Sequence, residues 1–142
     1  MTPEQITLIE ASWAEIRPIV PEVPALFYAR LFEIAPELRG MFPEDMAEQG
    51  QKLMAMLSAV VAGLRAPERL MPAVRELGER HAGYGVAPEH YAPVGAALIW
   101  TLDQGLDGGL DAPTREAWTA AYTILSAAMI DAAQSTTTEA AE

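Results

Sequence analysis

The chain has 142 residues, enough for one domain, and 51% of them are hydrophobic, which argues against disorder. It contains no cysteine, so disulfides, iron–sulfur clusters and thiolate metal sites are excluded. Lys and Arg number 9 against 20 Asp and Glu, and the resulting net charge of −11 repels nucleic acid and anionic lipid. We expect no membrane span and no secretory signal, and therefore a cytoplasmic protein.

Apolar residues recur with the spacing of an amphipathic helix almost throughout, and no run alternates like a strand. At the start, Thr2, Pro3 and Gln5 are typical of a helix N-terminus with a capping box. Prolines and glycines divide the rest of the chain into segments. Helices are expected at about 3–17, 21–34, 45–64, 67–83, 88–106 and 114–133, with a short helical turn that begins at Pro36.

Six unequal helices with proline-marked corners indicate an irregular all-α packing rather than a symmetric bundle. The helical pattern covers residues 1–133, which we interpret as a single domain without internal repeats or linkers. Residues 134–142, QSTTTEAAE, are polar and carry no apolar stripe. A disordered C-terminal tail is therefore expected over these last residues.

The two histidines are the first candidates for chemistry. His81 extends the register of Leu70, Val74 and Leu77, so its ring is predicted to project from an apolar helix face. On this pattern alone, His81 is either a core histidine bonded to a backbone carbonyl or a metal ligand. His90, in the first turn of the next helix, is expected at the surface or at the rim of a pocket.

Protein side chains alone offer little for catalysis in this sequence. The spacings of a zinc cluster, a nucleophile elbow, a dinucleotide fingerprint and a Walker loop are all missing. Haem makes a smaller demand, because the porphyrin supplies four iron ligands and a single imidazole completes the fifth position. An apolar slot between helices, one histidine and a few polar groups opposite it would be enough.

Five blocks, in order along nearly the whole chain, resemble the globin family. The similarity is strongest to bacterial single-domain globins and to the globin half of flavohaemoglobins. The blocks are FYARLF (27–32), Pro36 with Phe42, EQGQKLMAML (48–57), LGERHAGYGVAPEHY (77–91), and AW followed by AAY (117–122). This resemblance implies a globin fold, with roughly six to eight helices packed around haem b.

The resemblance also implies roles for individual residues. His81 corresponds to the proximal histidine, which is the iron ligand. Tyr28 corresponds to the distal tyrosine, Gln49 to the position where animal globins often carry the distal histidine, and Leu53 to the apolar distal position one turn on. Phe42 corresponds to the aromatic residue that wedges against haem. Further haem contacts are implied for Leu57, Leu77, Val86, Tyr91 and Val94, and polar contacts at the haem edge for Lys52, Arg80 and His90.

Two of these residues also have simpler interpretations. Phe42 by itself could belong to an ordinary core, and Gln49 could be solvated at a helix start. A glutamine on a buried stripe needs a partner, and Tyr28 is the partner expected if both face one pocket. The phenol and the amide would stabilise bound O2, which carries partial negative charge, so tight oxygen binding is expected.

The implied function is the binding or scavenging of O2, with NO and CO as further ligands, by a monomer or a homodimer. One alternative is nitric oxide dioxygenation with a separate reductase, because a polar tail is expected where flavohaemoglobins attach their reductase.

Flavohaemoglobins also make the proximal histidine more electron-rich through a tyrosine and a glutamate. Tyr91 matches the tyrosine, but Ala133 stands at the glutamate position and Asp131 is expected on another side of the helix. The sequence is also compatible with a gas or redox sensor that acts through a partner, and with a haem-free helical interaction domain.

Overall fold

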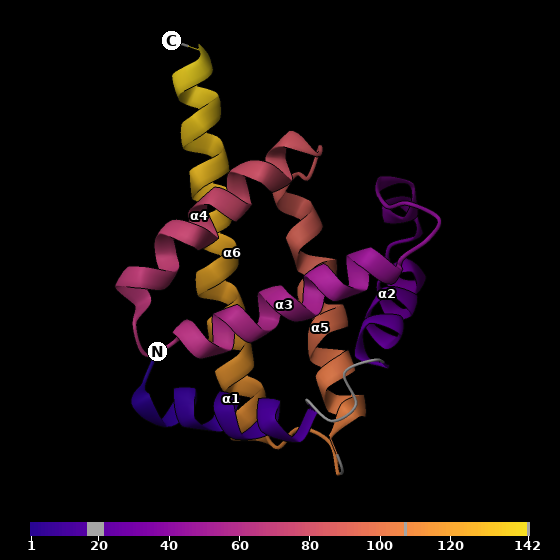
Figure 1. Cartoon of the computed structure of the whole chain (residues 1–142), viewed down its shortest axis with the longest axis vertical. Coiled ribbons are helices and arrows are strands. Elements are labelled where there is room, and N and C mark those ends of the chain that lie inside the picture. Colours follow the sequence, from indigo (N-terminus) through magenta and orange to yellow (C-terminus); the bar gives the residue numbers. More distant parts are fainter. Residues whose placement is uncertain (17–21, 107, 142) are drawn as a thin grey trace.

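The computed structural model describes residues 1–16, 22–106 and 108–141, and it describes side chains as far as residue 134. Figure 1 shows an all-helical chain, and the described residues contain no strand. The all-α class predicted from the sequence is confirmed. The elements are α1 (Pro3–Ile16), α2 (Val23–Ile34), the 3-10 helix η2 (Pro36–Met41), α3 (Ala47–Gly63), α4 (Pro67–Gly83), the 3-10 helix η3 (Pro88–His90), α5 (Tyr91–Gly105) and α6 (Ala112–Ala141).

The predicted helix starts follow from identifiable capping chemistry. The backbone N–H of Thr2 donates to Gln5 Oε1 at 3.0 Å, and the N–H of Gln5 donates to Thr2 Oγ1 at 3.1 Å. This reciprocal pair is the capping box expected from the sequence. Prolines lie in the first turns of α2, η2 and α4, where a missing N–H costs nothing. The helix end expected near Arg17 and the start expected at Pro21 lie outside the described residues.

The last helix differs from the prediction. Helix α6 extends to Ala141, whereas the sequence indicated an end near Ala133. After Pro113 no proline or glycine interrupts the chain, and alanine is frequent, so nothing in the local sequence stops the helix. Its final turns project beyond the other helices in Figure 1. The disorder expected over 134–142 stays a prediction.

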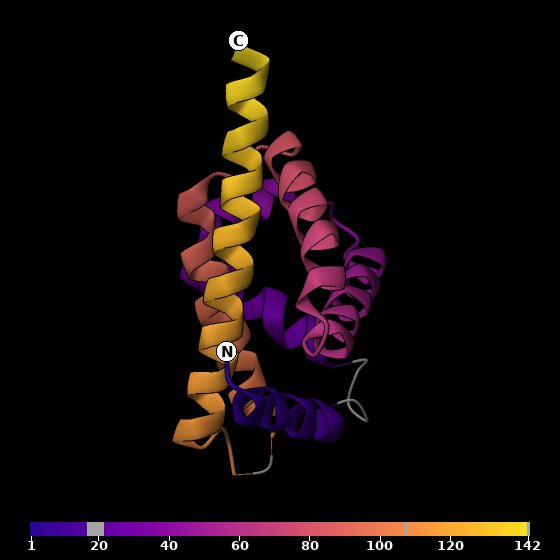
Figure 2. The same cartoon turned by 90° about the vertical axis from the view of Figure 1, so that its left-hand side faces the viewer.

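The helices pack in pairs, with α4 and α1 on α6 and with α2 on α5 (Figure 2). Two glycines permit the closest approaches. A side chain at Gly78 of α4 would collide with the backbone of Met129 on α6, and one at Gly95 of α5 would lie 2.6 Å from the ring of Tyr122. Helix α4 therefore packs chiefly on α6 and makes few contacts with α3.

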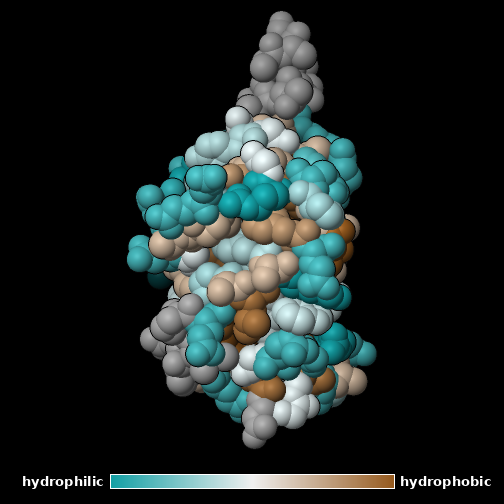
Figure 3. All heavy atoms as spheres, turned by 90° about the vertical axis from the view of Figure 1, so that its right-hand side faces the viewer, coloured by the Kyte–Doolittle hydropathy of each residue, from teal (hydrophilic) through white to brown (hydrophobic). Residues whose placement is uncertain are grey.

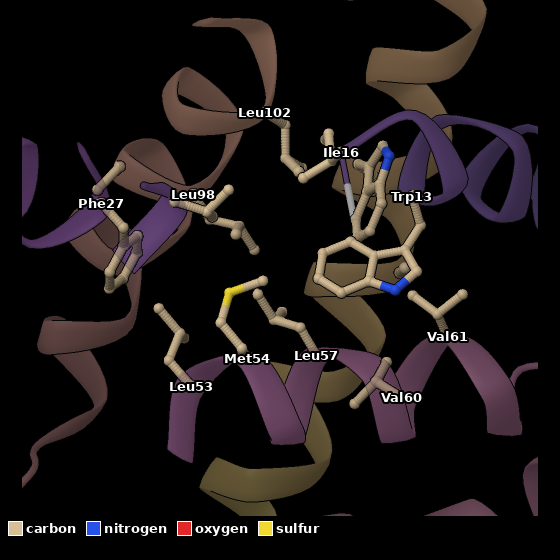
Figure 4. Packing of buried hydrophobic residues seen from close by; sticks show 14 of the residues in the cluster. Trp13, Ile16, Phe27, Leu53, Met54, Leu57, Val60, Val61, Leu98 and Leu102 are labelled. Carbon is tan, nitrogen blue, oxygen red and sulfur yellow. The ribbon is translucent and has the colours of Figure 1, made fainter. Parts of the chain in front are cut away.

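Helix α3 supplies one wall of the core. Figure 4 shows its buried apolar face turned toward residues of α1, α2 and α5. Leu53, Met54 and Leu57 are all at most 9% exposed. Trp118 ties α6 to α1 through its indole N–H, which donates to the buried Ser12 hydroxyl at 2.8 Å. Within the described part of the chain, no helix has both the length and the apolar content needed to cross a membrane.

Candidate functional site

His81 lies in the last turn of α4, and its Nδ1 is 2.8 Å from the carbonyl oxygen of Leu77. Because a carbonyl only accepts, Nδ1 carries the proton and donates, which leaves the lone pair of Nε2 available as a ligand. Burial lowers the pKa of His81, with Arg80 adding to the effect and the Leu77 hydrogen bond opposing it. The ring is therefore neutral near pH 7, the form that binds metals.

The chain turns sharply after His81. The N–H of Gly85 donates to the carbonyl of Ala82 at 3.0 Å, and the N–H of Val86 donates to the carbonyl of His81 at 3.0 Å. This pair of bonds is a Schellman motif, and it requires the left-handed conformation that Gly85 adopts with φ +87°. The motif holds Val86, a predicted haem contact, close to the histidine in space as well as in sequence.

Side chains around the end of α4 and the start of α5 are incompletely buried. Leu77, His81, Val86, Tyr91 and Val94 are all of intermediate exposure, although four of them are apolar or aromatic. The resemblance to globins implies haem contact for all five. Their incomplete burial fits a site whose walls need a further apolar group to cover them.

A second polar group is formed by residues of α2 and α3. Tyr28 is 6% exposed, and the side chain of Gln49, in the first turn of α3, lies close enough to its phenol to affect the pKa. Burial raises the pKa of Tyr28, while Gln49 works in the other direction. Gln49 itself is half-buried.

Aromatic rings enclose Tyr28. The rings of Phe27, Phe42 and Phe32 have centroids 4.9, 5.4 and 6.0 Å from the tyrosine ring. Phe42 is half-buried at the end of η2, and Leu53 is buried one turn after Gln49. In Figure 3, apolar side chains show between hydrophilic ones in the middle of the molecular face on the α2 side. The Tyr28 hydroxyl thus sits in largely apolar surroundings.

Arg39 is a residue that the sequence reasoning missed. Its Nη1 donates to the carbonyls of Phe42 at 3.2 Å and Pro43 at 3.0 Å, and its guanidinium lies 5.2 Å from the centre of the Phe32 ring. These contacts hold the segment that carries Phe42 against α2. The sequence offered one indication of this role: Arg39 lies three residues before Phe42, in the short helical turn that begins at Pro36.

The predicted edge residues have different surroundings. Lys52 and Arg80 are exposed, and their terminal nitrogens lie 3.7 Å from Glu48 and 3.6 Å from Glu76. Such solvated pairs are weak, so either cation can exchange its partner for another anion. His90 Nδ1 accepts the N–H of Ala87 at 2.9 Å and caps η3. The Nδ1 atom of His90 is thus committed to the backbone of the turn, and the predicted contact of His90 with the haem edge stays a prediction.

Behind the proximal side, Tyr91 and Tyr122 connect α5 with α6. The Tyr122 hydroxyl donates to the Tyr91 carbonyl at 2.6 Å, a contact with no sequence prediction. Asp131 is exposed and pairs with Arg75 at 2.8 Å, so its carboxylate is committed to α4. This agrees with the expectation that Asp131 lies on another side of α6 from the position of Ala133.

Within the described part of the chain, no three His, Cys, Asp or Glu side chains are arranged to hold a metal ion. Haem brings most of its own iron ligands, and the residues present fit it in three respects: one imidazole with an available Nε2, incompletely covered apolar neighbours, and a buried phenol beside an amide.

Comparison with known proteins also indicates a globin. A globin family model matches residues 25–129. A flavohemoprotein of Vibrio cholerae is 31% identical over 134 residues, covering 92% of this chain and 34% of the relative. Neuroglobin-1 of Oncorhynchus mykiss is 29% identical, with 91% of this chain and 90% of the relative covered. The chain thus spans about a third of the length of the flavohemoprotein it matches.

Solved structures share the fold over its whole extent. A bacterial globin from Campylobacter jejuni superposes with a TM-score of 0.79 at 26% identity, covering 94% of this chain and 97% of the other. An engineered carbene transferase made from a Rhodothermus marinus protein, which carries a provisional assignment as a nitric oxide dioxygenase, reaches 0.87 at 26% identity, with 100% and 99% covered. With a family model across α2 to α6 and these structural matches, the chain belongs to the globin family.

Proposed function

We propose that this globin binds haem b through His81 and holds O2, or NO and CO, between Tyr28 and Gln49 on the other side. Membership of the family implies haem binding. When bound, haem supplies a ferrous iron that takes a diatomic gas at its sixth position. The observation that carries the proposal is the proximity of two polar side chains from neighbouring helices: Tyr28, which is buried among aromatic rings, and Gln49.

The residues divide the work according to their surroundings. Leu77 fixes the orientation of the His81 ring through the Nδ1 hydrogen bond. Tyr28 stays protonated at neutral pH because burial raises its pKa, so its hydroxyl can donate to the partly negative outer atom of a bound gas. Gln49 orients that hydroxyl, while Phe42 and Leu53 limit the access of water. Tight oxygen binding, suited to scavenging, is the expected result.

At the edge of the site, Lys52 and Arg80 are the residues that would meet the haem propionates. Each is now paired with a glutamate one turn earlier on its own helix, in solvent. The exchange of one carboxylate for another costs little at such positions. His90 would act on the site indirectly, by capping the turn before Tyr91.

The decisive experiment is a visible absorption spectrum of the purified chain in the ferric, reduced and CO-bound states. We expect a Soret band that shifts on reduction and again with CO. His81→Ala should lose most of the haem, whereas the matched variant His90→Ala should keep it. A wild-type chain that takes up no haem would contradict the proposal and favour a haem-free interaction domain.

Nitric oxide dioxygenation is the second candidate, favoured by the structural match to the Rhodothermus marinus protein. The reaction combines NO with O2 and one electron to give nitrate, so a separate reductase would act as partner. The test is nitrate formation over many turnovers in the presence of a reductant. If the protein forms nitrate only once and no cell extract reduces its iron again, the result contradicts the dioxygenase proposal and leaves O2 binding as the function.

A cytoplasmic location stays a prediction from the sequence.

A further inference from the structure

The connection from η2 to α3 (residues 42–46) carries Phe42 and lies at the edge of the molecule in Figure 1. It is neither helix nor strand, so its carbonyl groups lack the partners that regular structure would supply. Arg39 supplies donors for them. Its Nη1 donates to the carbonyls of Phe42 at 3.2 Å and Pro43 at 3.0 Å, and its Nη2 donates to that of Glu44 at 3.4 Å. One guanidinium thus joins three consecutive carbonyls.

These partners distinguish Arg39 from other arginines of the chain. Five arginines pair with carboxylates: Arg30, Arg65, Arg75, Arg80 and Arg115. Carboxylates also lie close to Arg39 in the sequence, Glu37 and Glu44 among them, yet its N–H groups donate to backbone oxygens. A planar fork of five donors suits this arrangement, because it reaches several oxygens at fixed angles. The contacts of Arg39 therefore indicate a role in geometry rather than in charge.

Arg39 also contacts the aromatic rings around Tyr28. Its Cζ lies 5.2 Å from the centre of the Phe32 ring, within the range of a cation–π contact. The Phe32 and Tyr28 rings are stacked with centroids 6.0 Å apart. The Phe42 ring meets both of them, at 5.4 Å from Tyr28 and 5.5 Å from Phe32. Arg39 thus holds two members of this group of three rings, Phe32 through its ring and Phe42 through its carbonyl, and Tyr28 is the third.

We propose that Arg39 is a positioning residue for the gas site: its guanidinium fixes the Phe32 and Phe42 rings and, through them, the surroundings of the Tyr28 hydroxyl. The proposal rests on the function proposed above, in which this hydroxyl donates to a bound gas. A hydrogen bond is stronger where water is excluded. When the connection over residues 42–46 opens, Phe42 moves away from Tyr28, water reaches the phenol, and the bond to the gas weakens.

Hydrogen exchange of the backbone tests whether Arg39 holds the connection. Arg39→Met keeps the unbranched stem and removes the donors, whereas Arg39→Lys keeps the charge and removes the planar fork. The amides of Phe42 and Gly50 are hydrogen-bonded on either side of the connection, and we expect them to exchange about tenfold faster in Arg39→Met. Arg39→Lys should restore only part of the protection. Arg69→Met, at an exposed arginine of α4, is the matched control and should exchange like the wild type.

The haem-bound protein tests whether Arg39 acts through Tyr28. The infrared stretching band of bound CO reports the polarity around the gas, and Arg39→Met should move part of this band toward the position that Tyr28→Phe gives. O2 should dissociate about 2- to 5-fold faster from Arg39→Met. Adding Arg39→Met to Tyr28→Phe should change the O2 rate less than about twofold, because the residue through which Arg39 acts is already altered. Effects that multiply in the double variant would overturn the proposal.

Two further results would overturn it. If Arg39→Lys matches the wild type in exchange and in the CO band, positive charge alone is enough and the fork has no role. If Arg39→Met lowers the melting temperature but leaves the CO band unchanged, the role of Arg39 is structural only. Hydrogen exchange does not require haem, so equal exchange in Arg39→Met and the wild type marks failure of this proposal. Failure of the proposed function is distinct, because it appears as a chain that takes up no haem.

Discussion

Tyr28 and Gln49 come from segments about twenty residues apart, yet their side chains meet in an aromatic enclosure. In this position burial raises the pKa of Tyr28, so its hydroxyl keeps its proton over a wider pH range. The role of each residue is thus set by its surroundings, since the same tyrosine in water would form hydrogen bonds with solvent and gain little net free energy from any one partner.

This pair leads to a kinetic prediction for the haem-bound protein. Tyr28→Phe removes a hydrogen bond worth about 1–2 kcal/mol, so O2 should dissociate about 5- to 30-fold faster. Gln49→Leu should have a smaller effect, because Gln49 acts chiefly through Tyr28. Stopped-flow displacement of O2 by CO measures both rates. Dissociation of CO, which carries less negative charge, serves as the control and should change less. Unchanged O2 rates in both variants would refute the distal assignment.

Tyr122 supports a prediction of pH dependence. Burial, followed by the proximity of Tyr91, raises the pKa of Tyr122 above its usual value of 10.0. The unfolded chain therefore loses this proton at lower pH than the folded chain does. Stability from this group is complete below about pH 10 and falls as the pH rises above it.

Denaturant unfolding at about pH 8 and about pH 11 measures this loss as a fall in the free energy of unfolding. Tyr122→Phe should be less stable than the wild type at the lower pH, because the bond to the Tyr91 carbonyl is gone. It should also lose less stability between the two values. An equal loss in both proteins would assign the alkaline effect to other groups, among them Tyr28 and Tyr91, whose pKa values burial also raises.

At the scale of elements, helix boundaries follow local chemistry where a strong signal exists. The Thr2 capping box and the Gly85 Schellman motif begin and end helices at the places that the sequence indicates. The end of α6 has no such signal, and polarity alone led to a prediction about eight residues too short. Alanine-rich polar sequence is compatible with a helix whether or not it packs on anything.

The contact between α4 and α6 depends on a single glycine. A methyl group at Gly78 would collide with the backbone of Met129, and a backbone cannot move aside as a side chain can. Gly78→Ala should therefore push α4, with His81 one turn further on, away from α6. We expect a loss of roughly 1–3 kcal/mol in unfolding free energy, together with weaker haem retention.

Gly83→Ala provides the control for this substitution, because nothing lies within 4 Å of the added methyl group. Both glycines belong to α4, so the change in helix propensity is similar. Thermal unfolding followed by circular dichroism compares the two variants. If Gly83→Ala destabilises the protein as much as Gly78→Ala, the close approach of α4 and α6 is not the cause.

For the whole molecule, the net charge of −11 governs encounters with electron donors. Reduction of the ferric, haem-bound protein by a small cationic reagent should slow as salt rises from about 10 to about 500 mM, because screening removes the attraction. An anionic reagent should show the opposite trend, and a neutral reagent no trend. Rates from stopped-flow absorbance test this. A salt effect of the same sign for all three reagents would show that the charge of the chain does not control the encounter.

Much of the fold of this protein could be predicted from its amino-acid sequence. The all-α class, the helix starts and the globin resemblance rest on local periodicity, proline positions and short blocks such as the one around His81, and each depends on neighbours in the sequence. The proximity of Gln49 to Tyr28 is in keeping with the pairing that the resemblance implied, while their role toward a bound gas stays a prediction.

Other features were decided by the tertiary structure. The clamp of Arg39 on Phe42, the capping role of His90 and the bond from Tyr122 to Tyr91 all depend on atom positions or on contacts between helices. A helical pattern tells which face of a helix is apolar, but it does not tell which neighbour covers that face. That choice is made by the packing of all helices at once, where a single glycine at 78 or 95 sets how closely two of them approach.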